Sequence, residues 1–242
     1  ASFVDVAVLN KKTKEKFKVD KHEVKKYENN PAFEVLGEFN PMFTTQVGPV
    51  VKDSIKAYLR PETAQLIFAN FKAVQENARM SLPFGIAQIG KAFRNEISPR
   101  EFIFRDRELE QMEIEYFIAE GMKCPYMDEI KDIEVHIYTE DMQKKEAEPK
   151  KMKLVDAHKK GLIKTDWHAY WMGEAMKWFL NLGANPEKFR IRQHSTEEKS
   201  HYAVDTWDLE YEFPMGFREL QGFANRGDFD LKQHEKHSKK SL

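Results

Sequence analysis

Two stretches of the sequence carry charged side chains at the two-residue spacing of β-strands. Arg94 and Glu96 would share one face of a first strand, and Gln111 and Glu113 one face of a second. If the strands pair as a hairpin, both sets can lie together on one sheet face. Buried charges are costly unless they are paired. Two interpretations stay open: charges that pair on a solvated sheet face, or a substrate floor with arginines for phosphates and carboxylates for an ammonium group or a base edge.

The segment between these strands, 98–108, is polar and rich in arginine. Arg100, Arg105 and Arg107 fall within it. A planar guanidinium binds phosphoryl oxygens better than the point charge of a lysine does. We expect this loop to lie above the charged face.

The flanking sequence predicts the elements that position these groups. Pro83 precedes an expected strand over 84–97, and the second strand is expected over 109–118. A helix is expected to begin at 60–63, because apolar residues recur after them at the spacing of one buried helical face. The residues of that face are Ala64, Ile67, Phe68, Phe71 and Val74.

A second helix is expected after a cap at Thr165-Asp166, with Gly183 and Pro186 ending it. Its aromatic face is expected to pack in the core rather than to line a cofactor pocket. That face consists of Trp167, Trp171, Ala175, Trp178, Phe179 and Leu182.

The two ends of the sequence are less informative. Val4, Val6 and Val8 alternate as in an edge strand, and the lysines of residues 1–27 are interpreted as solvated, with RNA contact as the alternative. Strands are expected over 204–213 and 219–223, and the polar residues 232–242 predict no further element.

Together the elements predict an α+β fold, an antiparallel β-sheet flanked by helices.

Composition excludes several classes of protein. The 242 residues include 39 basic and 40 acidic side chains, a net charge of −1, so bulk charge would not hold nucleic acid. Cys124 is the single cysteine, which excludes an internal disulfide and a zinc site built from several cysteines. No apolar run approaches the roughly 20 residues of a membrane helix, and residues 1–5 lack the pattern of a signal peptide. A cytoplasmic protein with no membrane partner is expected.

Several sequence blocks resemble class II aminoacyl-tRNA synthetases, and in particular the glycyl-tRNA synthetases of the dimeric kind. Residues 93–100 with 104–108 resemble motif 2 of the class. The resemblance covers about 37–118 and 167–234. The other blocks that carry it, in the order of the family, are 39–43, 59–65, 87–92, 110–115, 219–226 and 228–231.

The resemblance implies an ATP site. Arg94 matches the arginine that binds the α-phosphate, Arg105 the one that holds the γ-phosphate, and Glu96 the position that reads adenine. These two arginines are the implied catalytic residues, and Mg²⁺ would bridge the phosphates. The other residues implied at the nucleotide are Asn95, Phe104, Asp106, Arg107, Glu108, Leu109, Glu219 and Leu220.

The resemblance also implies a glycine site and an activity. Glu62 and Glu113 match carboxylates that receive the glycine ammonium, with a wall formed by Leu109, Glu110, Gln111 and Met112. The implied activity joins glycine to tRNA(Gly) through glycyl-adenylate, with ATP consumed. The implied unit is a partial class II catalytic domain over 1–242, with an insertion at about 120–165 and a homodimer in the full-length protein.

The chain departs from the family pattern in ways that leave rivals open. Leu109 replaces a phenylalanine, Leu66 a glycine and Gly227 a threonine, and no motif 1, motif 3 or anticodon-binding domain is found, so the isolated chain is expected to be weakly active or inactive. One rival is a non-catalytic synthetase-like domain that binds RNA or protein, and another is a ligase for a different small amino acid. The intact Arg94 and the glycine-family sequence of the blocks oppose them.

Overall fold

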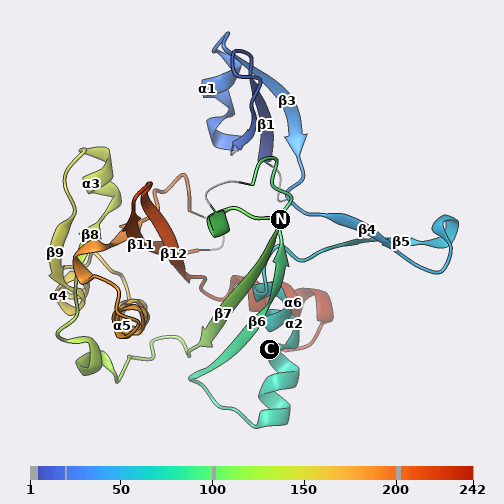
Figure 1. Cartoon of the computed structure of the whole chain (residues 1–242). Coiled ribbons are helices and arrows are strands. Elements are labelled where there is room, and N and C mark those ends of the chain that lie inside the picture. Colours follow the sequence, from blue (N-terminus) through green and yellow to red (C-terminus); the bar gives the residue numbers. More distant parts are fainter. Residues whose placement is uncertain (1–4, 20, 100–101, 200–202, 242) are drawn as a thin grey trace. The chain divides into compact units, whose positions relative to one another are not determined.

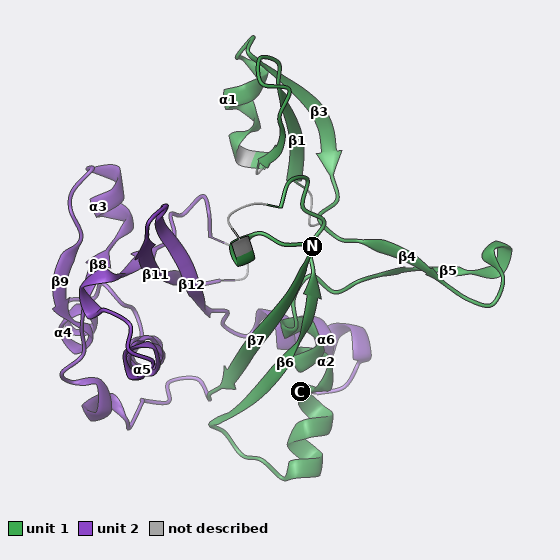
Figure 2. Cartoon of the chain, in the orientation of Figure 1, with its two compact units in different colours: residues 1–118 green, residues 119–242 purple. Residues whose placement is uncertain are grey.

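The structure is a computed structural model that describes residues 5–19, 21–99, 102–199 and 203–241 (Figure 1). Val4 and Arg100, named above, lie outside these residues. The chain divides into two compact units, residues 1–118 and 119–242, which Figure 2 distinguishes by colour. Both units mix helices with mainly antiparallel strands, as the sequence predicted.

Unit 1 begins with a small module, residues 5–39, whose sheet has the order β2-β1-β3. Val6, Val8 and Val19 form its buried core. The prediction that the first strand is an edge strand is wrong, because β1 pairs antiparallel with a neighbour on each side. The elements are β1 (Asp5–Asn10), β2 (Lys16–Val19), η1 (Lys21–Glu23), α1 (Val24–Glu28) and β3 (Phe33–Phe39).

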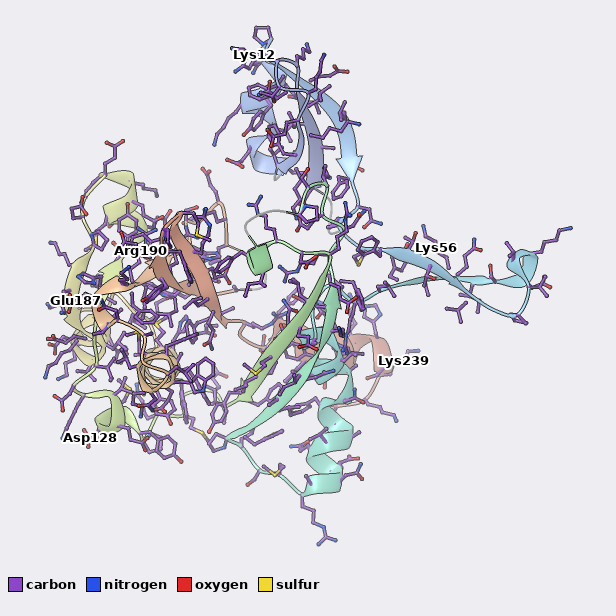
Figure 3. All side chains as sticks on the ribbon, in the orientation of Figure 1. Lys12, Lys56, Asp128, Glu187, Arg190 and Lys239 are labelled. Carbon is purple, nitrogen blue, oxygen red and sulfur yellow. The ribbon has the colours of Figure 1, made fainter. Side chains whose placement is uncertain are left out.

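A two-stranded ribbon follows, formed by β4 (Thr44–Val47) and β5 (Ile55–Tyr58) with η2 (Val51–Asp53) between them. Its strands bury no residue, and Ile55 is 75% exposed. Lys56 marks this ribbon in Figure 3. Because no core holds it, the ribbon depends on its own ladder of hydrogen bonds.

The third part of unit 1 is the β6–β7 hairpin with helix α2. The expected hairpin is confirmed: the strands pair antiparallel from Phe84↔Phe117 to Phe93↔Glu108. Helix α2 buries Ala64, Ile67, Phe68 and Phe71 as predicted, while Val74 is half-buried. Phe71 packs against Phe84 and Phe117 at ring distances of 5.6 and 4.6 Å, which fixes the helix to the hairpin. The elements are α2 (Ala64–Ala78), β6 (Phe84–Phe93), η3 (Phe102–Phe104) and β7 (Glu108–Phe117).

Unit 2 is built on one five-stranded sheet of order β12-β11-β10-β8-β9. The β8–β10 pair is parallel and the other pairs are antiparallel. The strands are β8 (Glu134–Tyr138), β9 (Lys150–Lys153), β10 (Phe189–Gln193), β11 (Asp205–Phe213) and β12 (Gly216–Asn225). The helices are η4 (Met127–Ile130), α3 (Glu140–Lys144), α4 (Leu154–Lys159), α5 (Asp166–Asn181), η5 (Pro186–Lys188) and α6 (Phe229–Ser238).

Helix α5 covers the core of unit 2. Its predicted cap is confirmed, since the Thr165 hydroxyl accepts a hydrogen bond from the His168 amide at 3.2 Å. The predicted buried face is wrong at its end: Trp178 is 48% exposed and Leu182 66%. The fully buried side chains include Ala169, Met172 and Met176, so the buried face is rotated from the aromatic stripe.

The segment 120–165 contributes to this core. Ile130, Ile137 and Leu154 are fully buried, and β8 lies between β10 and β9 in the sheet. Its description as an insertion remains a prediction. Helix α6, which the polar sequence did not predict, contains no buried residue.

Candidate nucleotide and amino acid site

The segment that precedes α2 is hydrogen-bonded to the end of the β6–β7 hairpin. The Phe93 amide donates to the Arg60 carbonyl at 2.8 Å, and Arg60 Nε donates to the Lys91 carbonyl at 2.6 Å. Arg94 Nε donates to the Pro61 carbonyl at 3.2 Å. Two motif segments about 30 residues apart in sequence are thereby held side by side.

Gly90 allows this close approach. A Cβ atom at that position would overlap Nη2 of Arg60. Any side chain on β6 at residue 90 would therefore displace the Arg60 guanidinium.

Asn95 fixes a third motif segment. Its amide donates to the Pro41 carbonyl at 2.7 Å, and its side-chain Nδ2 donates to the Asn40 carbonyl at 3.0 Å. Residues 39–43, which resemble an early family block, thus lie against the residues that follow β6.

The prediction that Arg94 and Glu96 share a strand face is wrong. Strand β6 ends at Phe93, and the Arg94 amide adds one more bond to the Arg107 carbonyl at 3.0 Å. The Glu96 amide then bonds back to the Arg94 carbonyl at 2.8 Å, so the chain turns away from the ladder. The polar side chains of 94–96 are consequently used to bind neighbouring segments.

Glu96 is only 8% exposed and is held from two sides. Its carbonyl accepts from Arg107 Nε at 3.0 Å, and its carboxylate Oε1 lies 3.1 Å from Nζ of Lys18 in β2. Burial of the carboxylate is compensated by this ion pair.

Glu113 is bonded to the start of α2. Its Oε2 accepts from the Thr63 amide at 2.5 Å and also from the Thr63 hydroxyl. Thr63 is fully buried, so its donors depend on this carboxylate. Neighbouring Glu62 is half-buried. Glu113 therefore has a structural role whatever else it binds.

Alternate residues of β7 point to opposite faces, as predicted. Leu109, Gln111 and Glu113 are half-buried on one face, and the Gln111 Oε1 atom is buried without a hydrogen-bond partner in the described part of the chain. Glu110 and Met112 lie on the exposed face, away from the other residues of the expected wall.

The expected nucleotide loop is only partly buried. Phe104 ends η3 and is half-buried, Arg105 is exposed, and Asp106 Oδ1 accepts from the Arg107 amide at 2.7 Å. Glu108 is bonded to Lys91, and this hydrogen bond raises the pKa of the lysine. Arg105 also lines a small pocket with Glu96.

Glu219 and Leu220 lie in β12 of unit 2, where Glu219 is exposed and Leu220 is half-buried. A Cβ atom on Gly222 would lie 3.3 Å from Glu219 Oε1 and 3.6 Å from Asp208 Oδ1. Two carboxylate oxygens thus approach one point above the sheet. Within the described ranges, no group of three or more His, Cys, Asp or Glu side chains is arranged to hold a metal ion.

Sequence reasoning missed a charged network on the same sheet. Arg192 contacts Asp208 Oδ2 and Glu210 Oε1, both at 3.1 Å, and Arg190 Nε contacts Glu210 Oε2 at 2.5 Å. Arg190, labelled in Figure 3, also lies 3.9 Å from the ring centre of Phe217. The two-residue spacing of these charges in β10 and β11 was the available signal.

His194 completes the network, with Nε2 at 2.6 Å from Asp208 Oδ2. Burial lowers the pKa of His194, but the hydrogen bond and charge of Asp208 outweigh it, so the pKa is raised.

Of the described helices, none has the length and apolar character needed to cross a membrane.

Glu113→Ala should lower the free energy of unfolding by about 2–3 kcal/mol, because the buried Thr63 donors lose a charged acceptor. Urea denaturation of the chain measures this change. Glu110→Ala, on the exposed face of the same strand, is the control and should change stability by no more than about 0.5 kcal/mol. Equal effects of the two substitutions would show that the Thr63 contact does not hold α2.

The raised pKa of His194 predicts that stability falls as the pH rises. The stabilisation is complete below the ordinary pKa of 6.5 and is lost as the pH rises through the higher folded-state value. Urea denaturation between about pH 5.5 and 9 should show this loss, and His194→Gln should remove it. His237→Gln, at an exposed position of α6, should keep the wild-type dependence. An unchanged pH dependence in His194→Gln would contradict the prediction.

No family model matches this chain. Curated relatives do. The chain is 43% identical over 206 residues to the glycine–tRNA ligase of Caldanaerobacter subterraneus subsp. tengcongensis, which is 85% of this chain and 36% of the relative. Identity is 44% to the enzyme of Geobacillus thermodenitrificans, over 85% of this chain and 35% of the relative. It is 46% to that of Thermus thermophilus, over 82% of this chain and 31% of the relative.

The chain spans about a third of the length of the curated relatives it matches. At 43–46% identity, the resemblance drawn from the motif blocks is confirmed across most of the chain. The sequence is therefore that of a relative of the glycine–tRNA ligases, and it corresponds to one part of those proteins.

Proposed function

We propose that this chain is part of the class II catalytic domain of a glycine–tRNA ligase, which activates glycine with ATP and transfers it to the 3′ end of tRNA(Gly). The observation that carries the proposal is the 41–46% identity to glycine–tRNA ligases over more than 80% of the chain. The hydrogen bonds that join the motif segments of unit 1 support it, because a substrate site needs its parts held together.

Arg94 is proposed to bind the α-phosphate of ATP. Its Nε is bonded to the Pro61 carbonyl, and its two Nη atoms have no partner among the described residues. The guanidinium is thus oriented while two of its nitrogens stay available, which is the preorganised donor that developing phosphoryl charge requires. Arg105, which is exposed, is proposed to hold the γ-phosphate and Glu96 to accept from the adenine amino group.

Glycine is proposed to bind with its ammonium toward Glu62, Gln111 and Glu113. Glu113 uses Oε2 for Thr63, which leaves Oε1 for another donor, and the buried Gln111 Oε1 is an acceptor. An ammonium group offers three donors, so several acceptors suit it. A larger amino acid would be rejected by exclusion, since misplacing the ammonium would leave buried acceptors unpaired.

The proposed chemistry needs no nucleophile from the protein. A carboxylate oxygen of glycine attacks the α-phosphorus, a new O–P bond forms, and the bond to pyrophosphate breaks. Arg94 and Arg105 would stabilise the negative charge on the phosphate oxygens during this exchange. The protein's contribution is then positioning and charge stabilisation.

Magnesium is proposed to accompany ATP and to neutralise phosphate charge. Mg²⁺ is usually bound by one or two carboxylates together with phosphates and water. Glu219 and Leu220 are further proposed to contact the nucleotide.

A homodimer, an insertion at about 120–165 and a cytoplasmic location complete the proposal for the full-length protein.

Glycine-dependent exchange between ATP and labelled pyrophosphate tests the function directly. The full-length protein should exchange with glycine at a rate at least about 100-fold above that with alanine or serine. Glu62→Gln should lower kcat/KM for glycine by about 10²-fold while the KM for ATP stays near wild type. Glu110→Gln, on the exposed face of β7, should match the wild type. Equal exchange with alanine or serine would overturn the assignment.

A further inference from the structure

A lysine of the N-terminal module of unit 1 forms an ion pair with Glu96, the proposed adenine-reading residue. Lys18 lies in β2, and its Nζ is 3.1 Å from Oε1 of Glu96 and 3.5 Å from Oδ2 of Asp5. Another lysine pair of this module, Lys21 with Glu38 at 2.9 Å, is far more exposed, at 56% and 69% of the two side chains. In the Lys18–Glu96 pair, the lysine side chain is only 28% exposed and the glutamate side chain only 10%.

Burial makes the Lys18 contact important for the carboxylate. A carboxylate that is only about a tenth exposed is costly to keep charged unless a partner compensates it. The described residues provide Lys18 alone as that partner, since Arg107 bonds the Glu96 carbonyl instead. Lys18 therefore fixes the direction of the Glu96 Oε1 atom.

The second carboxylate oxygen, Oε2, has no partner among the described residues. With Oε1 occupied, Glu96 can offer this oxygen only as an acceptor. An acceptor at this place favours a base that presents an amino group and disfavours one that presents a carbonyl. A small pocket beside Glu96 is formed by residues of the N-terminal module and by residues that follow β6. It is lined by Lys16, Lys18, Glu96, Ser98 and Arg105 among others.

We propose that Lys18 is a positioning residue for nucleotide selection, which holds Glu96 as a charged acceptor for the amino group of adenine. This inference rests on the proposed function. It makes the N-terminal module a part of the nucleotide site, so that recognition of the base depends on the packing of β2 against the residues that follow β6.

The experiment compares ATP with inosine triphosphate, which carries a carbonyl in place of the adenine amino group. Glycine-dependent pyrophosphate exchange by the full-length protein should show a clear preference for ATP. Lys18→Met should raise the KM for ATP about tenfold and reduce the preference by a similar factor, with kcat and the KM for glycine within about twofold of wild type. Lys18→Arg, which keeps the charge, should retain most of the preference. Lys21→Met is the matched control and should behave as wild type.

A double substitution separates positioning from general stability. Glu96→Gln should lose the preference, and Lys18→Met added to it should cause no further loss, because the two residues act through one contact. Thermal melting of each variant identifies any that fail to fold, in which case Lys18→Gln takes the place of Lys18→Met with the same expectation. A folded Lys18 variant with the wild-type preference would overturn this inference alone. Failure of the wild-type protein to exchange with glycine would overturn the proposed function and this inference with it.

Discussion

The arrangement of unit 1 depends on how residues 60–63 are held against the β6–β7 hairpin. This short segment has no regular structure, and its carbonyl groups and the Thr63 donors need partners from elsewhere. The hairpin supplies them through Phe93, Arg94 and Glu113. A typical hydrogen bond contributes about 0.5–1.5 kcal/mol and one to a charged group about 1.5–3 kcal/mol, so Glu113 contributes most.

The same contacts explain why some side chains of the candidate site have two roles. Glu113 uses one oxygen for Thr63, and Arg94 uses one nitrogen for Pro61. Each keeps another polar atom that no described residue contacts. A group whose position is already fixed loses little entropy when it binds a substrate, which favours recognition and catalysis.

Local patterns in the sequence predicted the elements well. The β6–β7 hairpin, the buried face of α2 and the Thr165 cap follow from spacing and residue type, and the structure confirms them. Motif resemblance predicted a similarity to glycine–tRNA ligases, and the identity to curated relatives confirms it. Helix α6 gave no periodic signal because it buries nothing, and the buried face of α5 differs because side chains of the sheet determine it.

Contacts between distant segments could not be predicted. The turn at Glu96 depends on Lys18, 78 positions earlier in the printed sequence, and on Arg107. Strand periodicity extended β6 to Ile97, since nothing local to residues 94–96 marks the end of the ladder. The network of Arg190 and Arg192 with Asp208 and Glu210 likewise requires the pairing of β10 with β11.

Amide hydrogen exchange of the chain tests most directly whether residues 60–63 and 95 are held by the hairpin. The amides of Thr63, Phe93 and Asn95 should exchange with the same opening free energy as the ladder of β6 and β7, because they open only when the hairpin does. The amides of the β4–β5 ribbon, which has no core, provide a fast-exchanging reference. If Thr63 and Asn95 exchange as fast as the ribbon while the β6–β7 ladder stays protected, the motif segments are not held together by these bonds.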